Sequence, residues 1–232
     1  MRTISQAQML RVPVNGATLN ADFVSPVNAR GIILFAHGSG SGRHSHRNQF
    51  VARVLQESEF ATLLMDLLTE QEERIDNQTR ELRFDIDLLA ARLSATVQWA
   101  SQHPMMKQLP IGLFGASTGA AGALVTAAKY PELVKSVVSR GGRPDLAGDS
   151  LPKVTTPTML IVGGHDDAVL VLNQQAKARM PGEVALKIVP RATHLFEEPG
   201  ALAQVADSAA AWFWRTLKTP APPANSSAGA TA

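Results

Sequence analysis

The sequence predicts an α/β fold in which a mostly parallel sheet carries helices on both faces. Two observations lead to this prediction: short apolar runs alternate with longer helical patterns, and an alternating segment around Asn15 and Gly16 precedes the first such run. Runs that are apolar throughout are typical of parallel strands covered on both sides. Strand, helix and strand in repetition indicate an open sheet with right-handed crossovers.

The expected elements follow one another along the chain. Residues 12–24 predict an antiparallel hairpin at a sheet edge. Parallel strands are expected at 31–37, 61–67, 111–116, 134–139, 158–163 and 184–189. Helices are expected at 48–59, 82–99 and 201–217, where apolar residues recur every three or four positions. Ligands of such sheets bind at the carboxyl ends of the strands, so function is expected in the loops that follow them.

The composition indicates one domain, residues 1–218, followed by a tail. Residues 219–232 carry no charge and consist mainly of Pro, Ala and Ser, which predicts a disordered segment. The chain of 232 residues has no cysteine. It is long enough to fold without disulfides, and neither a thiolate metal site nor a cysteine nucleophile is available to it.

Charge and hydropathy exclude two classes of partner. Lys and Arg number 22 against 20 Asp and Glu, and no basic run occurs, so we expect no nucleic-acid partner. No apolar stretch approaches the ~18 residues of a membrane span. The N-terminus lacks the apolar segment of a signal peptide, and we therefore expect a cytoplasmic location.

The strongest chemical motif is Gly115-Ala116-Ser117-Thr118-Gly119. It follows an apolar strand and precedes a helix rich in small residues, which is the setting that the G-x-S-x-G nucleophile turn requires. The chain must reverse sharply there while it holds one side chain at the sheet edge, and side chains at the two flanking glycines would collide. We therefore predict that Ser117 is a nucleophile.

A serine hydroxyl needs a base, and the base needs an orienting acid. In sheets of this type the chain order is Ser, then Asp or Glu, then His. Asp166 follows the strand at 158–163 and His194 follows the strand at 184–189. We predict Asp166 as the acid and His194 as the base. Asp167 stays open as an alternative acid, because adjacent carboxylates cannot be separated by sequence.

The glycine-rich loop after the strand at 31–37 predicts part of an oxyanion hole. We expect the backbone N–H groups of Ser39 and Thr118 to be its donors. The loop lacks the Lys of a phosphate-binding P-loop. His37, His44 and His46 show no complete ligand spacing, so we expect solvated loop histidines, no metal and no cofactor.

Together these segments resemble the α/β-hydrolase superfamily, and within it the branch named after dienelactone hydrolase. The resemblance runs from about residue 12 to residue 217 and is most specific in GASTGAAGA and ATHLFEEPG. Some relatives carry this hydrolase fused to a phosphoribosyltransferase domain. Dienelactone hydrolases have a cysteine at the nucleophile turn, whereas this chain has Ser117. The resemblance therefore implies a serine esterase that acts on a small-molecule ester without a cofactor.

Two segments bear on the shape of the site. Residues 140–157 are too few for a helical cap domain, which predicts an open cleft. One interpretation of the long, charged stretch at residues 69–83 is that it borders this cleft. We expect instead a solvated loop and helix start there, without a binding role.

The sequence leaves several alternatives open. The same triad serves acyl transfer to an acceptor other than water, including peroxide. A non-catalytic binding protein on a hydrolase fold is a further reading, because fold does not entail function. The sequence does not separate a monomer from a homodimer.

Overall fold

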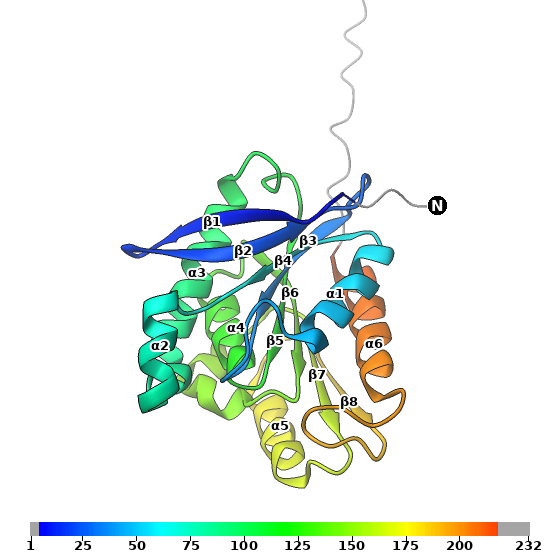
Figure 1. The fold of residues 1–232 in the computed structure, drawn as a ribbon. Helices are drawn as coiled ribbons and strands as arrows, with labels where there is room; N and C mark the ends of the chain where they lie inside the picture. The colour runs from blue at the N-terminus through cyan, green and yellow to red at the C-terminus, as the bar shows by residue number, and fades with distance from the viewer. Residues whose placement is uncertain (1–4, 218–232) are drawn as a thin grey trace, which may run out of the picture.

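An eight-stranded sheet runs through the centre of the computed structural model, which describes residues 5–217 (Figure 1). In spatial order its strands are β1 (Gln8–Val14), β2 (Ala17–Val24), β4 (Phe60–Met65), β3 (Gly31–Ala36), β5 (Ile111–Ala116), β6 (Val134–Arg140), β7 (Thr158–Gly163) and β8 (Val184–Val189). β1 pairs with β2, and β2 with β4, in antiparallel register, and the remaining neighbours are parallel. The α/β class and the N-terminal hairpin are thus confirmed.

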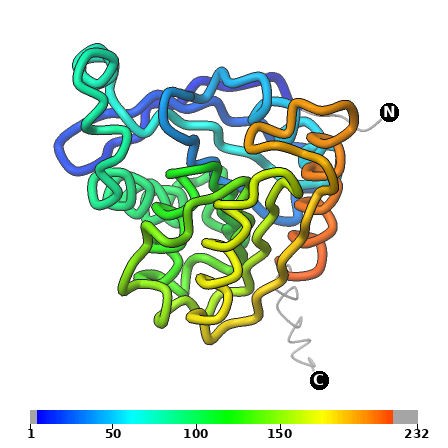
Figure 2. Tube along the Cα trace, turned by 90° about the horizontal axis from the view of Figure 1, so that it is seen from below, coloured from blue at the N-terminus to red at the C-terminus, as the bar shows by residue number. Residues whose placement is uncertain are grey.

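Helices cover both faces of this sheet (Figures 1 and 2). One apolar core joins the sheet to α3 (Ile86–Gln102), α4 (Thr118–Lys129) and α5 (Asp167–Arg179). The other core joins the opposite face to α1 (His46–Glu57) and α6 (Ala201–Thr216). The remaining helical segments are α2 (Glu70–Thr79) and the 3-10 segments η1 (Leu82–Phe84) and η2 (Pro144–Lys153). No helix within residues 5–217 is long and apolar enough to cross a membrane.

The helix α2 was missed, because residues 69–83 were expected to form a solvated loop and only the start of a helix. Thr69 accepts a hydrogen bond from the Glu72 N–H, and the Glu72 carboxylate accepts one from the Thr69 N–H. This reciprocal capping box fixes the start of α2. Arg80, in the left-handed conformation, ends it. The helix forms one corner of the trace in Figure 2.

Two further expectations needed correction. The strand at 184–189 exists, but β8 lies at the edge of the sheet and is not covered on both faces: its Ile188 is 41% exposed. The helix expected at 82–99 is divided, because the Asp85 side chain accepts from the Leu88 N–H and starts α3 after η1.

The segment between β6 and β7 holds only the short η2, in line with the expected absence of a cap domain. The tail predicted at 219–232 lies outside the described residues.

Candidate active site

Ser117 occupies a sharp turn between β5 and α4. Its backbone has φ 49° and ψ −121°, a region that residues other than glycine rarely adopt. The turn is held from two sides, because the Ser117 N–H donates to the Arg140 carbonyl at 3.2 Å and the Ser117 carbonyl accepts from the Arg143 N–H at 3.1 Å. Strain at a side chain raised above the sheet edge is typical of a nucleophile elbow.

The two glycines of the motif allow the backbone to pack closely around Ser117. A Cβ at Gly119 would lie 2.2 Å from the Ala36 carbonyl oxygen, and one at Gly115 would lie 2.5 Å from the Ala120 Cα. Both contacts are with backbone, which cannot move aside as a side chain can. The collision argued from the sequence is therefore found at both glycines.

The two predicted oxyanion residues are in direct contact. The Ser39 N–H donates to the Thr118 hydroxyl at 3.1 Å. Thr118 is the first residue of α4, where a backbone N–H has no acceptor within its own helix. A Cβ at Gly38 would lie 2.9 Å from the Ser117 Cβ, so the loop after β3 passes directly over the elbow.

The structure brings His194 and Asp166 together. His194 Nδ1 lies 2.7 Å from Asp166 Oδ2, and Asp166 is much less exposed than the imidazole, at 14% against 38%. Asp167, the alternative acid, is an exposed residue in the first turn of α5. Because Nδ1 faces the carboxylate, Nε2 is the ring nitrogen left for another partner.

Ser117 and His194 flank the same two residues at the end of β6. The Arg140 backbone carbonyl accepts a hydrogen bond from the Ser117 N–H. At the next residue, Gly141, an added Cβ would lie 3.6 Å from His194 Cε1. Gly141 has φ 50°, so a side chain there would be strained as well as crowded. No direct hydrogen bond joins the Ser117 hydroxyl to the imidazole among the interactions of residues 5–217.

A clamp that sequence reasoning missed holds the His194 loop. Both the N–H and the hydroxyl of Thr193 donate to Glu198 Oε1, at 2.9 and 2.6 Å. The hydroxyl of Thr193 is the main cause of the lowered pKa of Glu198. Arg191 and Phe196, on either side of His194, both have positive φ values. The only local feature of the sequence that could have indicated this clamp is a carboxylate five residues after a threonine.

His37 is not the solvated histidine expected from the sequence. Its Nε2 accepts from the Leu67 N–H at 2.9 Å, and its Nδ1 lies 3.0 Å from the Gly38 carbonyl oxygen. Burial lowers its pKa, although the Gly38 carbonyl and the carboxylates of Asp66 and Glu73 act in the opposite sense. The neutral ring therefore ties the loop after β3 to the chain after β4.

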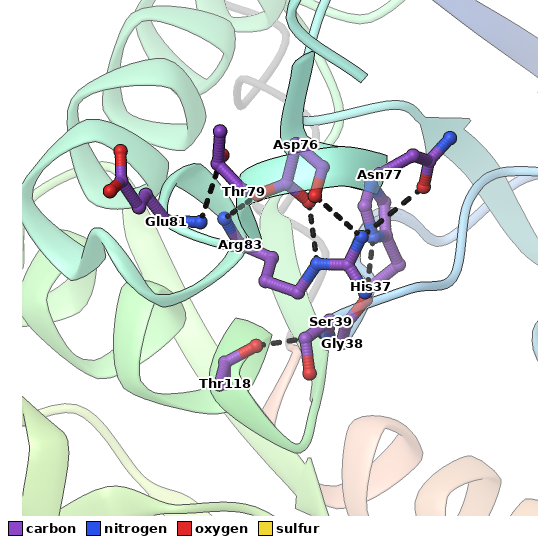
Figure 3. A network of polar contacts seen from close by, with 9 residues as sticks. All are labelled: His37, Gly38, Ser39, Asp76, Asn77, Thr79, Glu81, Arg83 and Thr118. Carbon is purple, nitrogen blue, oxygen red and sulfur yellow. Dashed lines mark hydrogen bonds and ion pairs between the residues drawn. The ribbon is translucent and has the colours of Figure 1, made fainter. Parts of the chain in front are cut away.

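A cleft with roughly 510 Å³ of empty space, much of it open to solvent, lies beside the Ser39 loop. Its wall includes residues of α2, so the charged stretch at 69–83 borders the cleft, which was the alternative to the solvated loop that we expected. Figure 3 shows Arg83 held there by Asp76 and Asn77, with Ser39 and Thr118 close by. A Cβ at Gly40 would lie 3.3 Å from Arg83 Nη1, so the guanidinium packs on the loop.

Asp76 is the anchor of this wall. Burial would raise its pKa, but hydrogen bonds from the backbone and side chain of Arg83 outweigh burial and lower it. On this wall the Arg83 guanidinium is therefore paired with the Asp76 carboxylate and is not a free charge. Within residues 5–217 no group of three or more His, Asp or Glu side chains is arranged to hold a metal ion.

The comparisons with known proteins define the class of this fold. Residues 29–212 match the family of alpha/beta hydrolase domains. The chain belongs to the α/β-hydrolase family. Within it the chain falls in the dienelactone hydrolase-like branch, since it is 53% identical to a dienelactone hydrolase from Anabaena variabilis. That similarity covers 92% of this chain and 99% of the other, with a TM-score of 0.91.

More distant and longer relatives complete the comparison. A carboxyl esterase from the fungus Tuber melanosporum shares the fold at 17% identity and a TM-score of 0.69, over 89% of this chain and 86% of its own. A protein of Mycobacterium tuberculosis with the provisional name phosphoribosyl transferase is 58% identical over 197 residues. That match covers 85% of this chain and 44% of the relative, so the chain spans less than half of its length.

Proposed function

We propose that the protein is a serine hydrolase that cleaves small carboxylic esters through Ser117, His194 and Asp166. The hydrogen bond of 2.7 Å between His194 and Asp166, beside a strained Ser117, is the observation that carries the proposal. The carboxylate fixes the tautomer in which Nε2 accepts a proton. Family membership supports hydrolysis as the class of reaction.

The reaction begins when Nε2 of His194 removes the Ser117 proton and Oγ attacks the ester carbonyl. The negative charge that develops on the carbonyl oxygen is stabilised by the N–H groups of Ser39 and Thr118. The substrate oxygen must replace the Thr118 hydroxyl as the acceptor of the Ser39 N–H. One such donor typically lowers the barrier by about 3–4 kcal/mol.

His194 then protonates the departing alcohol, and the acyl group remains on Ser117. Water attacks this acyl-enzyme with His194 again as base, which releases the acid and restores the serine. Every proton in this sequence passes through one imidazole. Residues of the chain therefore supply the nucleophile, the base and the oxyanion donors of this reaction.

The direct test is p-nitrophenyl acetate turnover by Ser117→Ala. Loss of a triad serine typically lowers kcat by about 10⁴-fold or more. Ser101→Ala, at the end of α3, is the matched control and should retain wild-type turnover. Turnover by Ser117→Ala above a few per cent of wild type would refute the assignment.

The acyl acceptor is a separate question that product analysis answers. If water is the acceptor, the free acid is the product even when methanol or peroxide is added. Formation of methyl esters or peracid at rates above hydrolysis would assign the chain to acyl transfer with the same three residues.

A further inference from the structure

Thr118, the first residue of α4, carries a buried hydroxyl next to the loop that follows β3. The residue is only 3% exposed, and its Oγ1 accepts a hydrogen bond from the Ser39 N–H at 3.1 Å (Figure 3). Among residues 5–217 this hydroxyl makes no hydrogen bond as a donor. A buried hydroxyl normally donates its proton as well as accepting one. The Thr118 hydroxyl therefore has a proton left to donate.

Most of the other buried threonines use this proton. Four of them donate to a backbone carbonyl: Thr96, Thr126, Thr156 and Thr158. Thr62 accepts from Gln56 at 2.7 Å and has no acceptor of its own among the described residues, but it lies within β4 and is not part of the cleft wall. Thr118 thus combines a free hydroxyl proton with a place on the wall of the cleft.

The cleft gives a substrate access to this hydroxyl. Thr118, Ser39 and Gly38 all line the cleft, which has roughly 510 Å³ of empty space. Gly38 also lies against the proposed nucleophile, since a Cβ there would be 2.9 Å from the Ser117 Cβ. A carbonyl group attacked by Ser117 can therefore direct its oxygen toward the Ser39 N–H and the Thr118 hydroxyl.

The backbone around the hydroxyl is fixed on both sides. In α4, a Cβ at Gly119 would collide with the His37 carbonyl oxygen, so the helix and the end of β3 pack backbone against backbone. In the loop, the His37 ring accepts from the Leu67 N–H at 2.9 Å. The approach of Ser39 to Thr118 is therefore set by the packing of the backbone and does not depend on their hydrogen bond alone.

We propose that the Thr118 hydroxyl is a third donor of the oxyanion hole, in addition to the backbone N–H groups of Ser39 and Thr118. The inference rests on the proposed function, because it assigns the hydroxyl to the same negatively charged oxygen. In the free protein the hydroxyl oxygen accepts the Ser39 N–H. When the ester oxygen takes over that N–H, the Thr118 O–H rotates and donates to the ester oxygen, and its proton stays on Thr118 throughout.

The opposite role, a hydroxyl that merely occupies the Ser39 N–H and competes with the substrate, is disfavoured by bond strength. A hydrogen bond to an ionised acceptor is about twice as strong as one between neutral groups. The developing oxyanion therefore displaces the neutral Thr118 oxygen. A hydroxyl already held beside the site then needs only a rotation about its C–O bond, and it acts mainly in the transition state.

The kinetic test replaces the hydroxyl by a methyl group of the same shape in Thr118→Val. We expect kcat for p-nitrophenyl acetate to fall at least about 10-fold, with KM changed less than about two-fold. Thr118→Ser keeps the hydroxyl and should retain most of kcat. Thr126→Val, further along α4, also removes a buried hydroxyl and should keep the wild-type kcat, because Thr126 lies outside the site.

A second substrate distinguishes an oxyanion donor from a residue that only supports the structure. In the matching p-nitrophenyl thionoester, sulfur replaces the carbonyl oxygen, and sulfur is a weak hydrogen-bond acceptor. We expect the ratio of kcat/KM for the oxygen ester over the thionoester to fall at least about five-fold in Thr118→Val. A distorted site would slow both substrates alike and leave the ratio unchanged.

The contact between the loop and the helix is tested without catalysis. Amide hydrogen exchange of Ser39, followed by NMR, should be faster in Thr118→Val than in wild type, because the Ser39 N–H loses its acceptor. Thr118→Ser should exchange as wild type does. If Thr118→Val fails to fold, as judged by circular dichroism, Thr118→Ala takes its place in all three measurements.

The outcomes separate this inference from the proposed function. A lower kcat together with a smaller oxygen-to-sulfur ratio supports the third donor. A lower kcat with an unchanged ratio, or a kcat of Thr118→Val equal to or above wild type, would overturn it while the triad stands. Turnover retained in Ser117→Ala would instead refute the proposed function, and the role of Thr118 with it.

Discussion

At the scale of single residues, geometry distinguishes the two neighbouring carboxylates that are candidates for the acid of the proposed triad. Asp166 and Asp167 differ by one position, yet only Asp166 directs an oxygen to His194. The reason is local geometry: Asp166 precedes α5 with a non-helical backbone, whereas Asp167 is already turned outward in the helix. No periodicity in the sequence distinguishes them.

We predict that Asp166→Asn lowers kcat for p-nitrophenyl acetate by about 10³–10⁴-fold, because an amide would favour the wrong imidazole tautomer. Asp167→Asn is the matched control one residue away and should change kcat less than about two-fold, since no hydrogen bond links it to His194. Steady-state kinetics of both variants provide the measurement. Equal losses in the two variants would contradict the role assigned to Asp166.

At the scale of elements, the close approach of α4 to the loop after β3 sets the elbow. We predict that Gly119→Ala destabilises the protein by about 3 kcal/mol or more, because the added methyl group meets backbone oxygens. Gly122→Ala, one turn later in α4, has its nearest contact at 3.6 Å. It should be neutral or stabilising by up to about 1 kcal/mol, since alanine favours a helix.

Urea denaturation of the two glycine variants measures this difference. The two substitutions add the same methyl group to the same helix, so general effects of the change cancel. Similar unfolding free energies for the two variants would show that the backbone at Gly119 relaxes more easily than the contact distances indicate.

Elements with strong local signals could be predicted from the sequence, and those that depend on distant contacts could not. The elbow around Ser117 and the hairpin at Asn15 are local, and the structure has both. The capping box at Thr69 was also local but was overlooked among charged residues. In contrast, the edge position of β8 and the enclosure of His37 depend on strand order and on chain segments far away in sequence.

At the scale of the whole molecule, the two apolar cores lie on opposite faces of the sheet. His37 joins the loop after β3 to the chain after β4, at the edge of the sheet where the parallel strands end. Its pKa is lowered in the folded protein, so the unfolded chain takes up a proton first as the pH falls below the ordinary value of 6.5. The stability that the neutral ring contributes is therefore complete above that value and is lost as the pH falls through the folded pKa.

We predict that the unfolding free energy of wild type decreases from about pH 7 to about pH 5 more steeply than that of His37→Gln, which lacks this titration. His46→Gln, which replaces an exposed histidine, should follow wild type. Urea denaturation at three pH values within this range provides the comparison. Parallel curves for wild type and His37→Gln would argue against a neutral, enclosed His37.

The most direct test of the central claim is covalent labelling with a fluorophosphonate, followed by peptide mass spectrometry. If Ser117 is the nucleophile activated by His194, the probe modifies one residue per chain, Ser117, and labelling is lost in Ser117→Ala and strongly slowed in His194→Ala. Modification of a different serine, or a wild-type chain that remains unlabelled while folded, would contradict the proposed triad.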